Sequence, residues 1–178
     1  LGHHMPAFGD ALSTEDIELA VSHVRTFCTD SSWPRGDLNL PRALFTEKAF
    51  PENETVWSMA VGTQGVKSVA NKLIYERRFG SRNQIEVVVP VSFEQISTGQ
   101  WSRRGLGDIA LGFKRVLTAS MDTGTIASAG AEVILPTGKE FYGFGNGYTV
   151  FEPFAMWGQL LPRNSYIQMH GGVELPFE

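Results

Sequence analysis

The first residues with types and spacing suited to chemistry lie in "HHMPAFG", residues 3–9. Met5 is followed directly by Pro6, and a helix-start signal comes a few residues later. A buried methionine needs no such framing, because its flexible side chain fills whatever gap a core leaves. A proline restricts the bend and so lowers the entropy lost when the sulfur is held in place. The pattern therefore indicates a methionine that delivers its sulfur to one fixed point.

The other candidate ligands are few, and they are His3, His4, His23, His170 and Cys28. Adjacent histidines are more often exposed loop residues than metal ligands, so His3 and His4 are interpreted as loop residues. His23 and His170 stand alone and are interpreted as structural. With a single cysteine, the chain has neither an internal disulfide nor a cysteine-based zinc site.

No catalytic motif accompanies these residues. The stretch "GFGNG", residues 143–147, follows an expected strand end and opens no helix, so it is interpreted as a flexible hairpin loop rather than a phosphate loop. No G-x-S-x-G motif or Ser-His-Asp set is recognisable. We therefore expect no enzyme activity. Seven charged residues within the expected strands are candidates for paired charges lining a barrel interior, and they are Glu76, Arg77, Arg78, Asp108, Lys114, Arg115 and Glu132. Solvated or mutually paired faces are the commoner outcome for such residues, so none is assigned a catalytic role.

The composition excludes some functions and leaves others open. The chain has 178 residues, 42% hydrophobic residues and a formal net charge of −4, with scattered basic residues, so we expect no nucleic-acid partner. No apolar run approaches the roughly 18 to 20 residues of a membrane-spanning helix. The chain starts at a leucine and ends at "VELPFE", in the middle of an expected strand. We interpret it as a fragment of a longer protein.

The elements that must position these residues begin with a helix. In residues 13–28 the apolar side chains recur at offsets of three and four, which predicts one apolar stripe on an amphipathic helix. Ser13 is a good N-cap with Asp16 three positions later, and Leu12 can pack on Ile17 across the first turn. An isolated helix of this length is marginal in water, so we expect it to have packing partners.

Residues 29–54 carry three prolines and show neither helical nor alternating periodicity. This segment is predicted to be an extended linker, pinned by Trp33 and Phe50. The predicted domains are therefore residues 1–28, the linker 29–54, and a strand region, 55–178.

After residue 54 the hydrophobic period changes to two. In one stretch Ile85, Val87, Val89, Val91 and Phe93 form an apolar row. In the next, the apolar residues are Ile109, Leu111, Phe113 and Leu117, opposite Asp108, Ala110, Gly112, Lys114 and Thr118. Further strands are expected near 66–79, 125–136 and 150–161, and the alternation returns over 167–175. The fold class is therefore mainly β, with one amphipathic α-helix in front.

The six or seven expected strands, each of roughly 10 to 14 residues, exceed the usual length of soluble strands. Their length suits a transmembrane barrel, whose tilted strands need about 9 to 11 residues to cross the hydrocarbon, with the apolar row facing lipid. A soluble β-sandwich or lipocalin-like barrel also has alternating strands and stays open as an alternative. Because the smallest closed barrel has about eight strands, we expect an open, curved antiparallel meander with an unpaired edge.

The stretch "MPAFGDALSTEDIELAVSHVRTFC" resembles the C-terminal end of a class I c-type cytochrome domain. In that family the methionine of an M-P-x-F-G turn is the distal axial ligand of the haem iron, and a final amphipathic helix packs over the haem. The resemblance implies that Met5 is the metal ligand and that Pro6, Phe8 and Gly9 complete the cofactor-binding turn. It also implies that residues 17–27 supply the packing face. A thioether is a soft, neutral ligand that raises the haem potential.

The C-x-x-C-H segment that attaches haem is absent from this chain, so the resemblance covers only the end of that domain. The stretches "KLIYERRFG", "GLGDIALGFKRVL" and "GAEVILPTGKE" resemble outer-membrane barrels found behind such cytochrome domains, and a barrel family linked to aromatic degradation. "WPRGDLNLPRALFTEKAFPE" resembles the linker of those fusions.

The resemblance implies electron transfer by a haem c domain, truncated here, that is tethered to a bacterial outer-membrane β-barrel. Its partners would be outer-membrane lipid and a periplasmic redox protein, with the N-terminal part in the periplasm. Two alternatives stay open. One is an outer-membrane transporter or channel barrel with no redox role, and the other is a soluble β-rich binding domain.

Overall fold

The structure, a computed structural model, describes residues 11–27, 33–41, 47–95, 99–163 and 165–177. The chain divides into two units, Leu1–Trp33 and Pro34–Glu178, and each is described by itself. Several residues singled out in the sequence lie outside the described residues, and they are Met5, Pro6, Phe8, Gly9, His3, His4 and Cys28.

In the first unit a single helix, α1 (Thr14–Arg25), confirms the predicted start signal. The Ser13 hydroxyl accepts a hydrogen bond from the Asp16 backbone N–H at 3.1 Å, and the Asp16 carboxylate accepts one from the Ser13 N–H at 3.3 Å. This reciprocal capping box satisfies two N–H groups that a helix start leaves unpaired. None of the helical residues is buried, and the His23 and Phe27 rings meet edge to face with centroids 5.1 Å apart.

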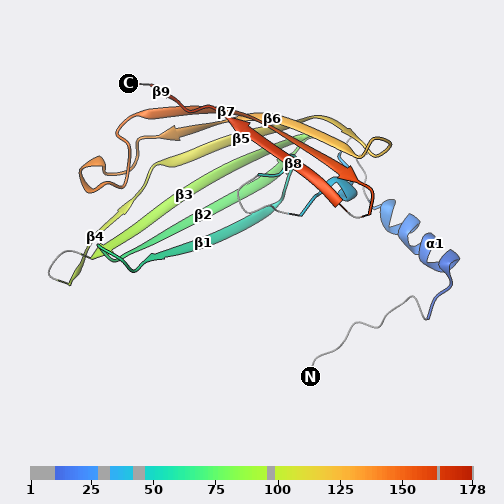
Figure 1. Cartoon of the computed structure of the whole chain (residues 1–178), viewed down its shortest axis with the longest axis horizontal. Helices are drawn as coiled ribbons and strands as arrows, with labels where there is room; N and C mark the ends of the chain where they lie inside the picture. The colour runs from blue at the N-terminus through green and yellow to red at the C-terminus, as the bar shows by residue number, and fades with distance from the viewer. Residues whose placement is uncertain (1–10, 28–32, 42–46, 96–98, 164, 178) are drawn as a thin grey trace. The chain divides into compact units, whose positions relative to one another are not determined.

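The second unit is one antiparallel sheet that curls into a half-barrel (Figure 1). Its strands are β1 (Glu54–Gly62), β2 (Ser68–Phe79), β3 (Asn83–Gln95), β4 (Trp101–Leu106), β5 (Ile109–Ser120), β6 (Thr125–Leu135), β7 (Thr149–Leu161), β8 (Ser165–Gly172) and β9 (Leu175–Phe177). The order is β1-β2-β3-β5-β6-β7-β8, with β4 on β3 and β9 on β7. The expected mainly β, curved antiparallel meander is therefore confirmed.

The described residues form nine strands, not the six or seven predicted, and β1, β4, β8 and β9 have nine, six, eight and three residues, fewer than the predicted 10 to 14. The five strands β2, β3, β5, β6 and β7 are 11 to 13 residues long. β4 leads into β5, and β8 leads into β9, so the sheet is a meander of long runs. Within the described residues β1 and β8 each have a neighbour on one side only, as expected for an open sheet.

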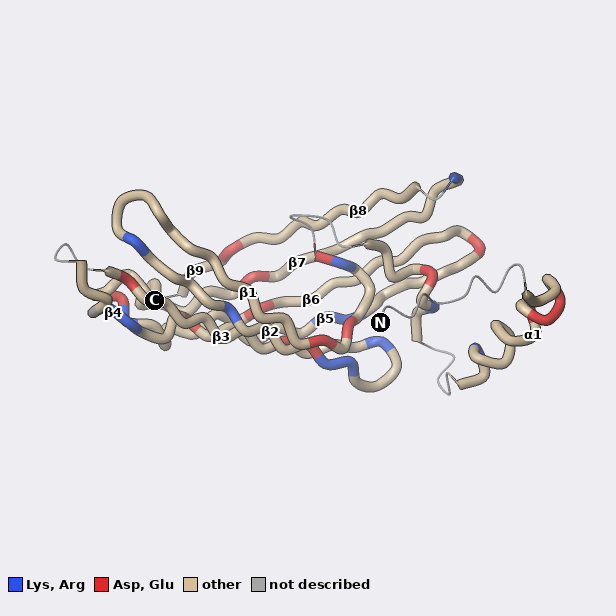
Figure 2. The backbone as a smooth tube through the Cα atoms, turned by 90° about the horizontal axis from the view of Figure 1, so that it is seen from below, with Lys and Arg blue, Asp and Glu red and all other residues tan. Residues whose placement is uncertain are grey.

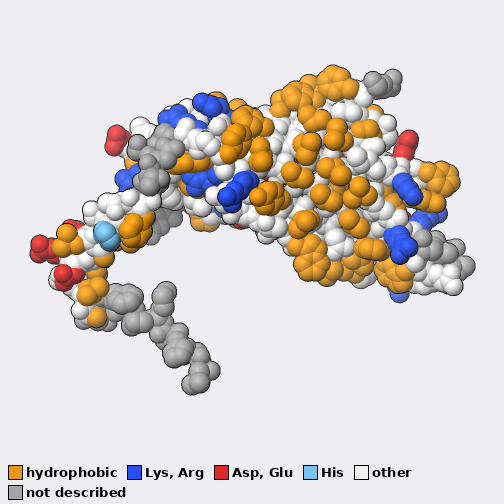
Figure 3. All heavy atoms as spheres, turned by 180° about the vertical axis from the view of Figure 1, so that it is seen from behind, with side chains coloured by type: hydrophobic (Ala, Val, Ile, Leu, Met, Phe, Trp, Pro, Cys, Tyr) orange, Lys and Arg blue, Asp and Glu red, His pale blue; other side chains and the backbone are white. Residues whose placement is uncertain are grey.

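The two faces of the sheet differ sharply in polarity. Apolar side chains on the outer, convex face are 39% to 66% exposed, and they include Trp57, Met59, Val61, Leu73, Ile85, Phe93, Leu111, Phe113, Ile167 and Met169. Figure 3 shows hydrophobic side chains spread widely over this side of the strands. The concave face carries glutamates, Lys114, Ser128 and several glycines.

A β-bulge on β5 reverses the direction that the sequence pattern predicted for Thr118. The register shifts between Val116, which pairs with Ser128, and Thr118, which pairs with Ala127. The extra residue puts Thr118 out of step with Lys114, so the two do not share a face as the simple alternation predicted. Ala119 takes the inward direction instead and packs against the buried cluster.

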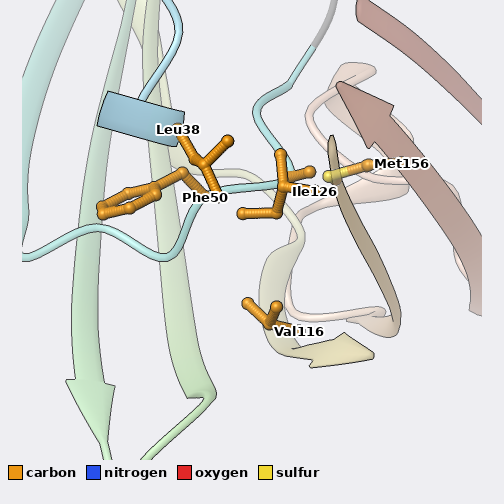
Figure 4. Close-up of a cluster of buried hydrophobic side chains, with 6 residues drawn as sticks. Leu38, Phe50, Val116, Ile126 and Met156 are labelled. Atoms are coloured by element: carbon orange, nitrogen blue, oxygen red, sulfur yellow. The ribbon is translucent and has the colours of Figure 1, made fainter. Parts of the chain in front are cut away.

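The buried core of the second unit lies on the concave side (Figure 4). Val116, Ile126 and Met156 come from β5, β6 and β7, whereas Leu38 and Phe50 come from the segment before β1. Leu38 belongs to η2 (Gly36–Leu38), a single 3-10 turn. The described parts of the predicted linker, 34–41 and 47–53, therefore pack against the sheet, and Phe50 is buried as expected for a pinning residue.

Candidate functional site: a carboxylate row on the concave face

A row of glutamates crosses the sheet along the direction of its hydrogen bonds. The cross-strand partners run in one line, and they are Glu54, Glu76, Glu86, Gly112, Glu132 and Glu152. Directly opposed residues point to the same face of a sheet, so these carboxylates share the concave side. Figure 2 shows acidic residues recurring on neighbouring strands.

Gly112 is the one position in this carboxylate row without a carboxylate. A Cβ added there would lie 3.2 Å from the Glu86 Cβ and 3.9 Å from a Glu132 carboxylate oxygen. The missing side chain leaves room for Glu86 and Glu132 to reach toward each other across β5. The row thus crosses six strands and carries a carboxylate on five of them.

Glu76 is buried near the β1 end of the row. Its cross-strand neighbours are Glu54 and Glu86, and the Gln84 amide nitrogen donates to Glu76 Oε1 at 2.7 Å. Three glutamates therefore converge here, and an amide donor holds the middle one.

Lys114 is a buried cation beside the carboxylate row. Its ammonium group interacts electrostatically with Glu76 and Glu86, and it donates to the Lys48 backbone carbonyl at 2.9 Å. Lys48 in turn pairs with Glu52 at 2.5 Å. Unlike an isolated buried ammonium, Lys114 is thus both hydrogen-bonded and surrounded by opposite charge.

The structure divides the candidate interior charges between the two faces. Glu76, Arg78, Lys114 and Glu132 occupy inward positions, whereas Arg77 and Arg115 occupy outward positions of their strands. Asp108 directly precedes β5, where it binds a loop. The carboxylates therefore neighbour one another more than they neighbour cations.

A cavity on the concave face borders the carboxylate row. Its lining includes Glu47, Glu86, Glu132, Glu152, Phe154 and His170. The Phe154 and His170 rings meet edge to face, with centroids 6.0 Å apart. His170, interpreted from sequence as structural, lies at this cavity. Sequence analysis did not single out Glu86 or Glu152 as candidates.

Three carboxylates at the β1 end of the carboxylate row lie close enough to share a cation. One oxygen each from Glu52, Glu54 and Glu76 falls within 4.8 Å of the others. Oxygen-only ligand sets suit hard cations such as Ca²⁺ or Mg²⁺. Two of these carboxylates already have partners in the protein, because Lys48 pairs with Glu52 and the Gln84 amide donates to Glu76.

The "GFGNG" stretch is a loop, as expected, but the structure gives it fixed contacts. The Asp108 carboxylate accepts hydrogen bonds from the Gly138 N–H at 2.9 Å and the Asn146 N–H at 2.7 Å. Gly143 and Gly147 adopt positive φ values of 73° and 76°, a region that glycine enters without strain. The carboxylate therefore ties the long β6–β7 connection to the start of β5.

Comparison with known protein families, curated proteins and solved structures found no match to this chain. In the part of the chain that the structure describes, no helix has the length and apolar character needed to cross a membrane. The strand order and the two faces define the fold as an open, curled antiparallel half-barrel with an apolar convex face and a carboxylate-lined concave face.

Proposed function

We propose that the strand unit forms part of the wall of an outer-membrane β-barrel and lines a polar path for cationic or neutral polar solutes. The observation that carries this proposal is the inverted polarity of the sheet, with apolar side chains exposed outside and carboxylates inside. A soluble sheet of this kind would place its apolar row in a core. A barrel in lipid does the reverse, because only its outer surface meets hydrocarbon.

The lengths of the connections support an orientation for this wall. The turns between β2 and β3, β5 and β6, and β7 and β8 have three, four and three residues. The connections at the opposite end have five residues between β1 and β2, five between β3 and β4, and 13 between β6 and β7. Outer-membrane barrels have short periplasmic turns and longer external loops. The short-turn end would then be periplasmic, and residues before β1 enter from that side.

The carboxylate row supports a preference for cations along the concave face. Aligned like charges with few cationic neighbours generate a negative potential, which attracts cations and repels anions. Phe154 and His170 add an aromatic edge beside these groups. Solutes that combine positive charge with an apolar part fit such a surface.

A pair of neighbouring substitutions on β2 tests the lipid-facing surface. Leu73 lies on the convex face and is 45% exposed, whereas Ile74 lies on the concave face. We expect Leu73→Arg to weaken insertion into phospholipid vesicles by roughly 2–4 kcal/mol and Ile74→Arg to have a much smaller effect. Insertion is measured as the fraction that floats with vesicles after a carbonate wash. Equal insertion by both variants would contradict the proposal.

A second candidate function is electron transfer beside the membrane, and the features of α1 support it. No residue of α1 is buried, although the helix has an apolar stripe and a complete capping box. A helix with these features fits a role in packing on a further domain, such as the haem c domain implied by the resemblance, where Met5 would be the iron ligand. Covalent haem in the native protein, detected by haem staining and its reduced-minus-oxidised spectrum, tests this proposal. A colourless native protein would end it.

A further inference from the structure

Two arms of the chain, residues 34–41 and 47–53, lie against the concave face of the half-barrel. Leu38, Leu40, Ala49 and Phe50 in these arms are all buried. Leu38 and Phe50 contact the cluster formed by Val116, Ile126 and Met156 (Figure 4). This apolar cluster contains most of the buried hydrophobic residues of the second unit.

Side chains of four strands bind the arms through backbone atoms. The Gln84 side-chain oxygen accepts from the Glu52 N–H at 2.6 Å, and the Gln168 amide donates to the Pro41 carbonyl at 2.7 Å. Lys114 and Ser128 donate to the carbonyls of Lys48 and Ala49. Because these bonds come from β3, β5, β6 and β8, they span most of the width of the half-barrel.

The arms lie toward the end of the sheet where the connections are short. Val116 and Ile126 flank the β5–β6 turn, and Leu40 lies over Gly158, near the β7–β8 turn. A Cβ at Gly158 would come within 2.9 Å of Leu40 Cδ1, so the glycine provides the room for this arm. Glu132 and Glu152 lie farther from these turns.

No described residue of either arm belongs to a strand of the sheet. The arms are held by side-chain hydrogen bonds and by the buried apolar cluster, not by a strand ladder, so they can leave without breaking one. Backbone without ladder bonds opens at lower free energy than the strands beside it.

We infer that the arms are an internal plug that closes the short-turn end of the concave face and is released as a unit. This inference rests on the proposed function, because a plug matters only if solutes move along that face. Lys114 and Ser128 hold residues 47–53 in place through their hydrogen bonds to the Lys48 and Ala49 carbonyls. The carboxylate row then lies between the plug and the long loops, and it is reached from the long-loop end while the plug is in place.

Amide hydrogen exchange of the whole chain in detergent micelles tests the plug. We expect residues 47–53 to exchange faster than β5 and β6, and Lys114→Met to speed their exchange at least about tenfold without changing β5 and β6. Lys72→Met is the matched control, because Lys72 also faces inward on β2. Ser128→Ala is a milder second variant, which removes the hydrogen bond from Ser128 to the Ala49 carbonyl.

A disulfide gives the converse test. In a Cys28→Ser background, Ala49→Cys with Ser128→Cys should link the arm to β6, and the oxidised form should slow exchange of 47–53 to the rate of the strands. Exchange of the arms at the strand rate in the unmodified chain, or joint acceleration of arms and strands by Ser128→Ala, would overturn the inference. Vesicle insertion is measured separately, so failure of the plug and failure of the proposed function give different results.

Discussion

Glu76 and Glu86 are cross-strand partners on β2 and β3, and both face the concave side. Two carboxylates on directly opposed residues repel each other when both are ionised. The pair lies toward the β1 end of the carboxylate row. It makes the row sensitive to any change that removes one charge.

We expect Glu86→Gln to stabilise the folded chain at neutral pH by on the order of 1 kcal/mol, because it removes a like charge and supplies an amide donor for Glu76. Urea unfolding in detergent micelles measures the difference. It should vanish at acid pH, where all carboxyl groups are protonated. Glu18→Gln on α1 is the control. A loss of stability at neutral pH would show that the Glu86 charge is needed for folding.

Close backbone approach on β6 predicts a strong effect at Gly130. A Cβ there would overlap the Phe113 carbonyl oxygen and the Phe154 ring, so we expect Gly130→Ala to cost about 2–3 kcal/mol. Gly171→Ala on β8 should be nearly neutral, because nothing lies within 4 Å of the added carbon. Urea midpoints of both variants provide the comparison. Similar midpoints would mean that β6 and β7 are not packed as described.

Asp108 predicts a local effect on the β6–β7 connection. Asp108→Ala removes the acceptor of two backbone hydrogen bonds, each charge-assisted and worth about 1.5–3 kcal/mol. We expect faster proteolysis within residues 139–147 and little change in the strands. Asp122→Ala, in the exposed β5–β6 turn, is the control. An unchanged cleavage rate would show that Asp108 does not hold the connection.

The proposed orientation predicts which end can be labelled from outside a cell. In a Cys28→Ser background, Phe141→Cys lies in the long connection at a position 91% exposed, whereas Asp122→Cys lies in a short turn. A membrane-impermeant maleimide should label the first in intact bacteria and the second only after the outer membrane is opened. Labelling of Asp122→Cys alone would reverse the orientation.

The alternation of apolar and polar residues predicted the strands well, because each strand has one apolar, convex side and one polar, concave side. The apolar row from Ile85 to Phe93 and its polar partners follow from period two alone, and the bounds of β2, β6 and β7 lie within two residues of the prediction. The helix start followed from Ser13 and Asp16, since a capping box is a local interaction. Both features need only near neighbours in the sequence.

The carboxylate row could not be predicted in the same way. Whether Glu86 aligns with Glu76 and Glu132 depends on turn lengths and on the absence of a bulge between them, which are properties of several strands at once. The packing of the arms was also hidden, because Pro34, Pro41 and Pro51 indicate extended backbone and not what that backbone contacts. The β5 bulge broke the alternation at Thr118 for the same non-local reason.

The most direct test of the central claim is the depth of Trp57, which is 66% exposed on the convex face of β1. The chain with Trp57 as its single tryptophan, the others replaced by phenylalanine, is inserted into vesicles whose lipids carry bromine on their acyl chains. We predict strong quenching of Trp57 fluorescence. A tryptophan placed instead at Phe154, inside the half-barrel, should be quenched weakly. Equal emission with and without bromine at Trp57 would contradict the account.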